Sequence, residues 1–293
     1  MMVRKGLHLK LGKTQVQISA SRVLLYIFII ALVCFTALPL VYVVTTSFKP
    51  IDELLKFPPQ FFVKKPTGQN FKDLITAVSS SSVPFLRNVV NSLFVTVVTV
   101  FLTVIVSSMG AYSMAKMDLP YKNVIFSVII AALMFPSSVT TIPTYLIVKN
   151  LGLLNTYWSL IIPKVGVAFN FFLMKQFCEQ FPTPLLEAAR IDGANELRIF
   201  TRIVFPFLAP AWATLIVFSF VSSWNDYSAQ LIYITNEAMR TLPFAIHAIS
   251  DGGSLARSGA MAAGTFIMTA PTVIIYTLMQ RRVIETMAHT GIK

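Results

Sequence analysis

Charged residues are scarce in this sequence of 293 residues. Only 12% are Asp, Glu, Lys or Arg and 55% are hydrophobic, whereas a soluble domain carries about a quarter charged residues. The mean hydropathy is +0.71, which implies more apolar surface than a water-soluble fold can bury. The scarcity of charge therefore excludes an ordinary soluble domain and indicates that lipid is the solvent for most of the chain.

Cysteine and the common catalytic patterns are also scarce. Cys34 and Cys178 lie in or beside apolar runs without CxxC or metal-ligand spacing, so we expect no disulfide framework and no metal site. No GxxxxGK[ST] loop, Ser-His-Asp set or paired carboxylates occur in the spans, so we expect no ATP site and no catalytic residue in this chain. The net charge of +12 is spread between apolar runs, which argues against a nucleic-acid partner.

Six long stretches with few or no charges predict membrane-spanning helices. A helix needs about 20 residues to cross a hydrocarbon core of roughly 30 Å, and only helices or closed barrels satisfy the backbone there. The alternating segments of a membrane barrel are absent, so we expect an all-α, polytopic membrane protein. The predicted spans are 23–48, 88–115, 123–148, 150–174, 203–225 and 258–280.

The basic residues predict the orientation of these spans. With the N-terminus in the cytoplasm, more of the 24 Lys and Arg residues fall in cytoplasmic than in outer segments, as the positive-inside rule requires. We therefore expect both termini in the cytoplasm. Residues 1–22 would form an N-terminal segment, 23–282 the transmembrane domain and 283–293 a tail.

A polar segment at 179–206, between the fourth and fifth predicted spans, is the most patterned part of the sequence. Thr183 can cap a first short helix, with Pro184 at its first position. Gly193 can end that helix, and Asn195 can cap a second one. We therefore predict a two-helix elbow on the cytoplasmic side, suited to lie in a groove of another protein.

This segment resembles the coupling motif of permeases of ATP-binding-cassette importers. The family pattern is Glu-Ala-Ala, three residues, Gly, nine residues, Ile, one residue, Leu and Pro, before the penultimate span. The chain has Phe205 where Leu is usual and otherwise keeps the spacing with Glu187, Ala188, Ala189, Gly193, Ile203 and Pro206. The resemblance implies that the elbow, Asp192 included, sits in a cleft of a cytoplasmic ATPase, where Glu187 meets a basic residue.

Other segments resemble the carbohydrate branch of that family, and in particular the shorter, six-span partner of the maltose-type permease pair. They are 187–194 (EAARIDGA), 224–226 (WND) and 240–243 (RTLP). The resemblance implies half of a translocation path for an oligosaccharide or related carbohydrate, in a bacterial inner membrane. The implied partners are a second homologous permease, two cytoplasmic ATPase subunits that hold ATP and Mg, and an extracellular solute-binding protein.

The resemblance also implies roles for two terminal or loop segments. The tail residues Thr290, Gly291 and Lys293 would reach the paired ATPases. An outer loop, for which a plain flexible connector is the alternative, would contact the binding protein through Asp251, Gly252, Gly253 and Ser254.

Several polar or aromatic residues in the spans are candidates for the substrate path. A lysine within a span usually faces a cavity or a partner, so Lys164 either lines the path, where it would suit an acidic sugar, or snorkels to the outer interface. Asn170, Trp224 and Asn225 are further candidates, because sugars present hydroxyls and CH patches. The alternatives are a helix-to-helix hydrogen bond for any Asn, favoured for Asn91, and an aromatic belt for Trp224.

Two other functions compete with a sugar permease. One is a permease of the same class for a non-sugar solute. The other is an ion-coupled secondary transporter, which needs an ion or proton site within the membrane. The spans hold no Asp, Glu or His except Asp226 at the edge of one of them, which makes this second alternative weaker.

Overall fold

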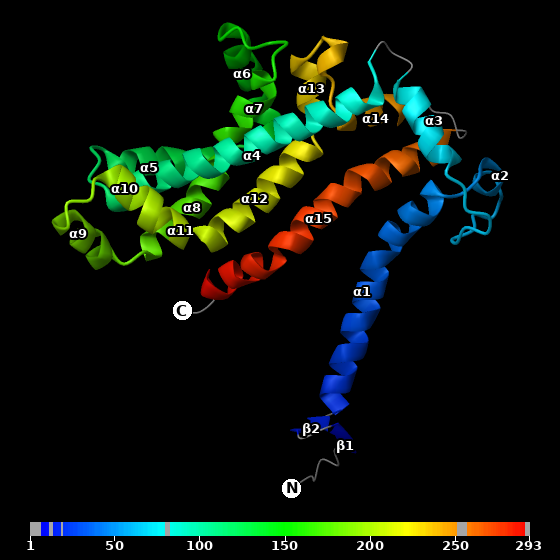
Figure 1. Ribbon diagram of the computed structural model, residues 1–293, viewed down its shortest axis with the longest axis horizontal. Helices are drawn as coiled ribbons and strands as arrows, with labels where there is room; N and C mark the ends of the chain where they lie inside the picture. Colours follow the sequence, from blue (N-terminus) through cyan, green and yellow to red (C-terminus); the bar gives the residue numbers. More distant parts are fainter. Residues whose placement is uncertain (1–6, 12–13, 19, 80–82, 251–256, 291–293) are drawn as a thin grey trace.

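The chain forms a helical membrane domain preceded by a small β-hairpin (Figure 1). The computed structural model describes residues 7–11, 14–18, 20–79, 83–250 and 257–290. Strand β1 (Leu7–Leu11) pairs antiparallel with β2 (Thr14–Ile18), with Leu9 opposite Val16. This hairpin is the one described part of the chain that departs from the predicted all-α class.

Three helices are long and apolar enough to cross a membrane unbroken. They are α1 (Ala20–Ser47), α4 (Phe85–Lys116) and α15 (Ser258–Thr290), and they confirm the first, second and sixth predicted spans. Helix α15 continues without a break into the tail predicted at 283–293, as far as Thr290.

Each of the other three predicted spans is a pair of helices joined at a bend, so the described residues hold up to six spans. The pairs are α5 (Lys122–Ala132) with α6 (Ser137–Asn150) at 114°, α7 (Trp158–Val165) with α8 (Ala168–Gln180) at 42°, and the run from α10 to α11 (196–207) with α12 (Ala209–Trp224) at 77°.

The bends correct two of the predicted spans. A continuous helix over 123–148 does not form, because Pro136 has no N–H to donate and takes an extended conformation before α6. The predicted span 150–174 lies at 158–180 instead. Gly152 and Asn155 have positive φ angles of 69° and 59°, so the chain turns there before α7 begins.

Short helices cover both ends of the bundle (Figure 1). The elbow end carries α9 (Thr183–Ile191), α10 (Glu196–Ile199), the π-turn η1 (Phe200–Val204) and α11 (Phe205–Phe207). The opposite or far end carries α2 (Ile51–Leu54), α3 (Gln69–Val78), α13 (Ser228–Tyr233), the 3-10 turn η2 (Glu237–Met239) and α14 (Leu242–Ser250).

Helix α4 is the centre of the bundle and packs against α7, α8, α12 and α14. Small and polar side chains on its buried face permit close approach of the neighbouring backbones. The Asn, Ser and Thr residues of that face are Asn88, Asn91, Ser92, Thr96, Thr99, Thr103, Ser107 and Ser108.

Helix α1 stands apart from this bundle and packs mainly on α15 (Figure 1). Its side chains are apolar and exposed over nearly its whole length, which suits a lipid environment. Its far end is held by Asn70 of α3, whose amide donates to the carbonyl oxygens of Ser47 at 2.9 Å and Lys49 at 2.7 Å. Gly259 permits this contact, because a Cβ there would lie 2.3 Å from Asn70 Oδ1.

Candidate functional site

The elbow forms from the local signals that the sequence carries, with one correction. Gly193 adopts a φ of +77° between the two helices, and Asn195 Oδ1 accepts the N–H of Arg198 at 2.8 Å, so both predicted cap positions are confirmed. Thr183 is not the N-cap. Pro182 holds that position and Thr183 begins α9, which moves Pro184 one residue into the helix.

A three-residue network ties the elbow to the central helix. Glu196 Oε2 accepts the hydroxyl proton of Tyr112 at 2.6 Å, and Glu196 Oε1 accepts from Arg190 Nε at 2.8 Å. These residues come from α10, α4 and α9. The hydrogen bond from Arg190, followed by that from Tyr112, lowers the pKa of the Glu196 carboxyl. The bonds therefore stabilise the elbow above the ordinary pKa of that carboxyl, and the effect is lost as pH falls through the lowered value.

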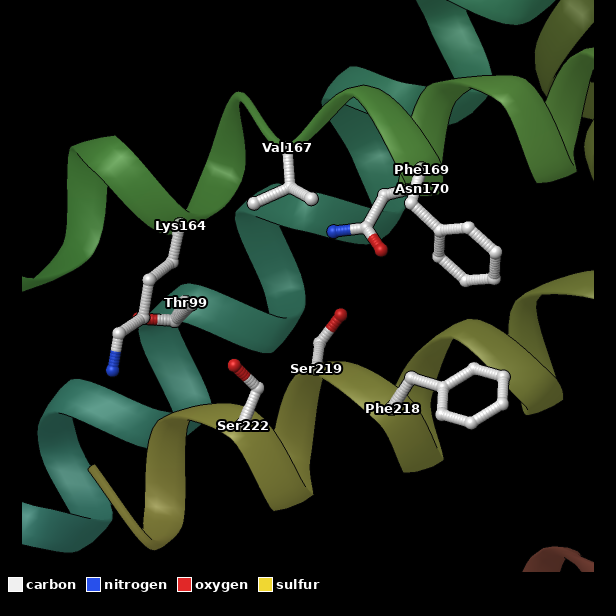
Figure 2. Close-up of a pocket in the computed structure, with 8 residues that line it drawn as sticks. All are labelled: Thr99, Lys164, Val167, Phe169, Asn170, Phe218, Ser219 and Ser222. Carbon is white, nitrogen blue, oxygen red and sulfur yellow. The ribbon is translucent and has the colours of Figure 1, made fainter. Parts of the chain in front are cut away.

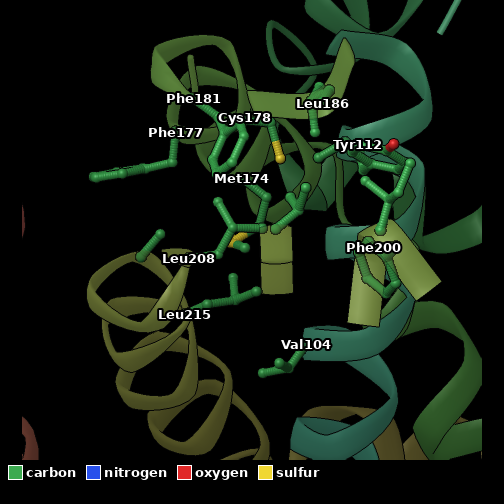
Figure 3. Close-up of a cluster of buried hydrophobic side chains, with 14 residues drawn as sticks. Val104, Tyr112, Met174, Phe177, Cys178, Phe181, Leu186, Phe200, Leu208 and Leu215 are labelled. Carbon is green, nitrogen blue, oxygen red and sulfur yellow. The ribbon is translucent and has the colours of Figure 1, made fainter. Parts of the chain in front are cut away.

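A hydrophobic cluster under this network seats the elbow on the bundle (Figure 3). Leu186 of α9 and Ile199 of α10 are fully buried in it. Most of the other buried members come from α4, α8, η1 and α12. We call the whole set the elbow cluster. It consists of Val104, Ala111, Tyr112, Met174, Phe177, Cys178, Phe181, Leu186, Ile199, Phe200, Val204, Leu208, Ala211 and Leu215.

The outward face of the elbow is apolar around an unpaired carboxylate. Leu185, Ile191 and Leu197 are 54%, 86% and 64% exposed. Glu187 is exposed beside them and makes no hydrogen bond or ion pair with the part of the chain that the structure describes. Exposed apolar residues around a free charge are typical of a surface that binds another protein.

The remaining motif residues divide between this face and the elbow cluster. Ala188 and Asp192 are exposed, and Ala189 and Ile203 are partly buried against the cluster. Pro206 lies in α11, just before the bend into α12. Phe205, where the family pattern has Leu, stacks on Trp212 with ring centroids 5.9 Å apart, so the larger side chain is accommodated.

A cavity of about 270 Å³ lies between α4, α12 and the break that separates α7 from α8. Figure 2 shows Asn170 of α8 and Ser219 of α12 pointing toward one another across it, with Phe169 and Phe218 at one end and Lys164 at the other. The hydroxyls of Thr99 and Ser219 find no hydrogen-bond partner among the described residues. The full lining is Thr99, Lys164, Val167, Phe169, Asn170, Phe218, Ser219 and Ser222. We call it the first cavity.

Lys164 lines this cavity. Its Nζ lies 2.7 Å from Asp226 Oδ2, and the two side chains are only 18% and 20% exposed. The prediction that Lys164 faces a cavity is met, but the charge is already paired within the chain. This pair could not be predicted from the sequence, because its members lie far apart along the chain.

The other three path candidates have different surroundings. Trp224 does not line the cavity. It is 2% exposed, and its Nε1 donates to the carbonyl oxygen of Met268 at 2.9 Å, so it belongs to the packing between α12 and α15.

Asn91 bonds neighbouring segments, as expected: its amide donates to the carbonyl oxygens of Ala238 and Arg240. Asn225 lines a second cavity nearer the far end.

Some predicted site residues lie outside the described residues. These are Asp251, Gly252, Gly253 and Ser254 of the outer loop, and Gly291 and Lys293 of the tail. Thr290 is described as the last residue of α15.

Two sets of polar residues at these sites were not predicted from the sequence. Tyr112, Arg190 and Glu196 meet at the elbow, although Tyr112 and Glu196 lie 84 positions apart in the sequence. Thr99, Ser219 and Ser222 line the first cavity. Neither set has a sequence signal of its own, because Ser and Thr are common in membrane helices, where they also bond their own backbone.

Comparison with known proteins finds a matching family and several relatives. Residues 74–287 match the family described as binding-protein-dependent transport system inner membrane components. The chain is 30% identical to the polygalacturonan/rhamnogalacturonan transport system permease protein YtcP of Bacillus subtilis, over 87% of this chain and 91% of that one. It is 29% identical to the arabinooligosaccharides transport system permease protein AraQ of the same bacterium, over 94% and 98%.

The fold is also similar to solved structures. A chain of a bacterial ABC transporter involved in the import of the acidic polysaccharide alginate matches with a TM-score of 0.77 and 23% identity, over 90% of this chain and 98% of that one. Another match, at a TM-score of 0.50 and 14% identity over 88% and 93%, comes from a bacterial alginate ABC transporter in complex with a periplasmic protein bound to alginate pentasaccharide.

The network around Glu196 predicts a local effect on the elbow. Glu196→Gln or Tyr112→Phe should increase amide hydrogen exchange in α9 about fivefold at pH 7, because each loses a hydrogen bond that contributes on the order of 1 kcal/mol. Glu187→Gln is the matched control and should leave the exchange unchanged. Equal protection of α9 in all three variants and the wild type would contradict a clamping role for the network.

Proposed function

This chain belongs to the binding-protein-dependent transport system inner membrane components, and from that premise we propose that it forms one half of the translocation path of an ATP-driven importer of oligosaccharides or related carbohydrates. It is a multi-pass inner-membrane component of a transport system, not a catalytic enzyme. The observation that carries the proposal is the elbow, whose outward face combines exposed apolar side chains with the unpaired Glu187.

The elbow is suited to receive movement from an ATPase. A rigid wedge in a groove moves with the groove, and the spans attached to it then rotate as a body. The elbow cluster and the Tyr112–Glu196–Arg190 network supply that rigidity. We assign ATP hydrolysis, with its ATP and Mg, to two cytoplasmic partner subunits, and the docking role to Glu187, Ala188, Ala189, Asp192, Gly193, Ile203 and Pro206.

Two further partners complete the proposed importer. The family description states dependence on a binding protein, and an alginate transporter of similar fold has been solved with one. We assign the contact with that protein to the outer loop 251–254, and a contact with the ATPases to Thr290, Gly291 and Lys293. A second homologous permease would supply the other half of the path.

The orientation that fits these partners places the elbow and both termini in the cytoplasm. The elbow end would then face the ATPases and the far end the binding protein. Residues 1–22 and 283–293 would be cytoplasmic segments, and the second of these would project toward the ATPases.

The carbohydrate assignment rests on the chemistry of the first cavity. Hydroxyls of Thr99, Ser219 and Ser222, an amide from Asn170 and two phenyl rings line it. Sugars present hydroxyls along their edges and CH patches on their faces, and such a lining matches both. The permeases of polygalacturonan and arabinooligosaccharide transport among the relatives support the same class.

Reversing the charge of the elbow should detach the ATPase. With Glu187→Lys, we expect the ATPase recovered with the tagged chain to fall at least about tenfold, because a charged contact of about 1–3 kcal/mol becomes a repulsion. Asp118→Lys makes the same change at another exposed carboxylate of the elbow end and should recover ATPase normally. Normal recovery with Glu187→Lys would refute the docking role.

The orientation can be measured with single cysteines in a Cys34→Ala, Cys178→Ala background. A membrane-impermeant thiol reagent applied to intact cells should label Lys65→Cys at the far end and leave Asp118→Cys at the elbow end unlabelled. Both side chains are exposed in the structure, so access to the reagent depends on the side of the membrane. Labelling of Asp118→Cys from outside would overturn the orientation and the cytoplasmic elbow with it.

The cavity lining predicts a loss of transport without a loss of folding. In proteoliposomes that contain the complete importer, Asn170→Ala should reduce uptake of the oligosaccharide held by the binding protein about fivefold, as expected for one lost hydrogen bond of about 1 kcal/mol. Asn123→Ala, at an exposed amide of α5, is the control. If the wild-type importer takes up an amino acid and does not take up any oligosaccharide, the carbohydrate assignment is refuted.

A further inference from the structure

A second polar cavity adjoins the first one toward the far end. It has a volume of about 570 Å³, and Ser222 of α12 lines both cavities. Its polar lining includes Ser137, Ser138 and Thr141 of α6, and Asn225, Asp226 and Ser228 beyond α12. Hydroxyl and amide groups therefore continue from one cavity into the next.

The Lys164–Asp226 ion pair stands between these cavities. Lys164 lines the first cavity and Asp226 lines the second, and their charged atoms are 2.7 Å apart. Asp226 is itself held in place, because its Oδ1 accepts the N–H of Ala229 at 3.1 Å at the start of α13. The pair thus joins the last turn of α7 to the segment between α12 and α13.

The charges of the pair cancel within the lining. The residues that line the two cavities carry one positive and one negative charge, those of Lys164 and Asp226. An anionic substrate bound at Lys164 would displace Asp226 and leave that carboxylate unpaired beside a second negative charge, which is unfavourable in a site of low dielectric. A sugar hydroxyl can donate to Asp226 and accept from Lys164 without adding charge.

We propose that the Lys164–Asp226 ion pair is a barrier between the two cavities on the substrate path, and that this path takes uncharged oligosaccharides. The barrier can open because it bridges two places where a helix ends: α7 is set at 42° to α8 across the break at Gly166, and α12 ends before Asp226. Ion pairs that join such elements are commonly exchanged when a protein switches state. The substrate part of this inference rests on the carbohydrate function proposed above.

The barrier can be tested without any substrate. In the Cys34→Ala, Cys178→Ala background of the complete importer, Ser138→Cys reports on the second cavity and Ser219→Cys on the first. A small impermeant thiol reagent is applied from the side of the membrane on which it reaches Ser138→Cys. Applied from that side, it should label Ser219→Cys only slowly. Removal of the pair by Lys164→Met should speed labelling of Ser219→Cys about tenfold, the change that corresponds to about 1.4 kcal/mol. Lys149→Met, at an exposed lysine of α6, should not.

Further variants separate a barrier from a general loss of structure. Asp226→Asn should act like Lys164→Met, and the exchange Lys164→Asp with Asp226→Lys should restore slow labelling. Fast labelling of Ser219→Cys in the parent would overturn the barrier. So would unchanged labelling when either charge is removed, or failure of the exchange to restore protection.

The substrate class is tested by uptake into proteoliposomes with a neutral arabinose or glucose oligosaccharide and an oligogalacturonate of the same length. We expect the neutral compound to be imported at least about tenfold faster, since the acidic one must displace Asp226. Faster import of the oligogalacturonate would overturn the assignment of an uncharged substrate. If neither compound enters while the labelling results hold, the carbohydrate function fails and the barrier stands.

Discussion

Helices in a membrane gain little from hydrophobic burial against one another, because the lipid tails around them are equally apolar, so close packing and interhelical hydrogen bonds must hold a bundle together. Helix α4 meets this constraint with a buried face of Asn, Ser and Thr side chains. The small hydroxyl residues let α8 and α12 lie close to α4. Asn91 and Ser92 form hydrogen bonds with the backbone of residues 238–242 at the far end. The other buried helices are arranged around that face.

The same constraint explains where the helices are broken. A free backbone group costs several kcal/mol in hydrocarbon, so irregular backbone at membrane depth occurs where it is enclosed by protein or lines a polar cavity. The break between α7 and α8 lies beside the first cavity, and the segment after α12 lies beside the second. Polar residues gather at these places: Asn170, Lys164 and Asp226 are all within a few positions of a helix end.

The sequence predicted what depends on local composition and could not predict what depends on contacts between distant segments. Hydropathy and length located α1, α4 and α15, and the cap residues Gly193 and Asn195 located the elbow. Proline could not be interpreted in the same way: Pro136 breaks a span, whereas Pro39 and Pro271 lie within continuous helices. The Lys164–Asp226 pair and the burial of Trp224 likewise follow from how α7, α12 and α15 pack.

The elbow and the cavity are connected by two helices, α8 and α12. Met174 of α8 and Leu215 of α12 belong to the elbow cluster, and each lies four residues from a cavity residue, Asn170 and Ser219 respectively. Residues four apart share one face of a helix. On each of the two helices, the side chain that packs in the elbow cluster and the side chain that lines the cavity are therefore neighbours on one face. In the proposed importer, a rotation of the elbow that carries Leu186 with it would therefore displace both cavity walls. The Lys164–Asp226 ion pair lies beside the cavity where the helices end, at the α7–α8 break and after α12.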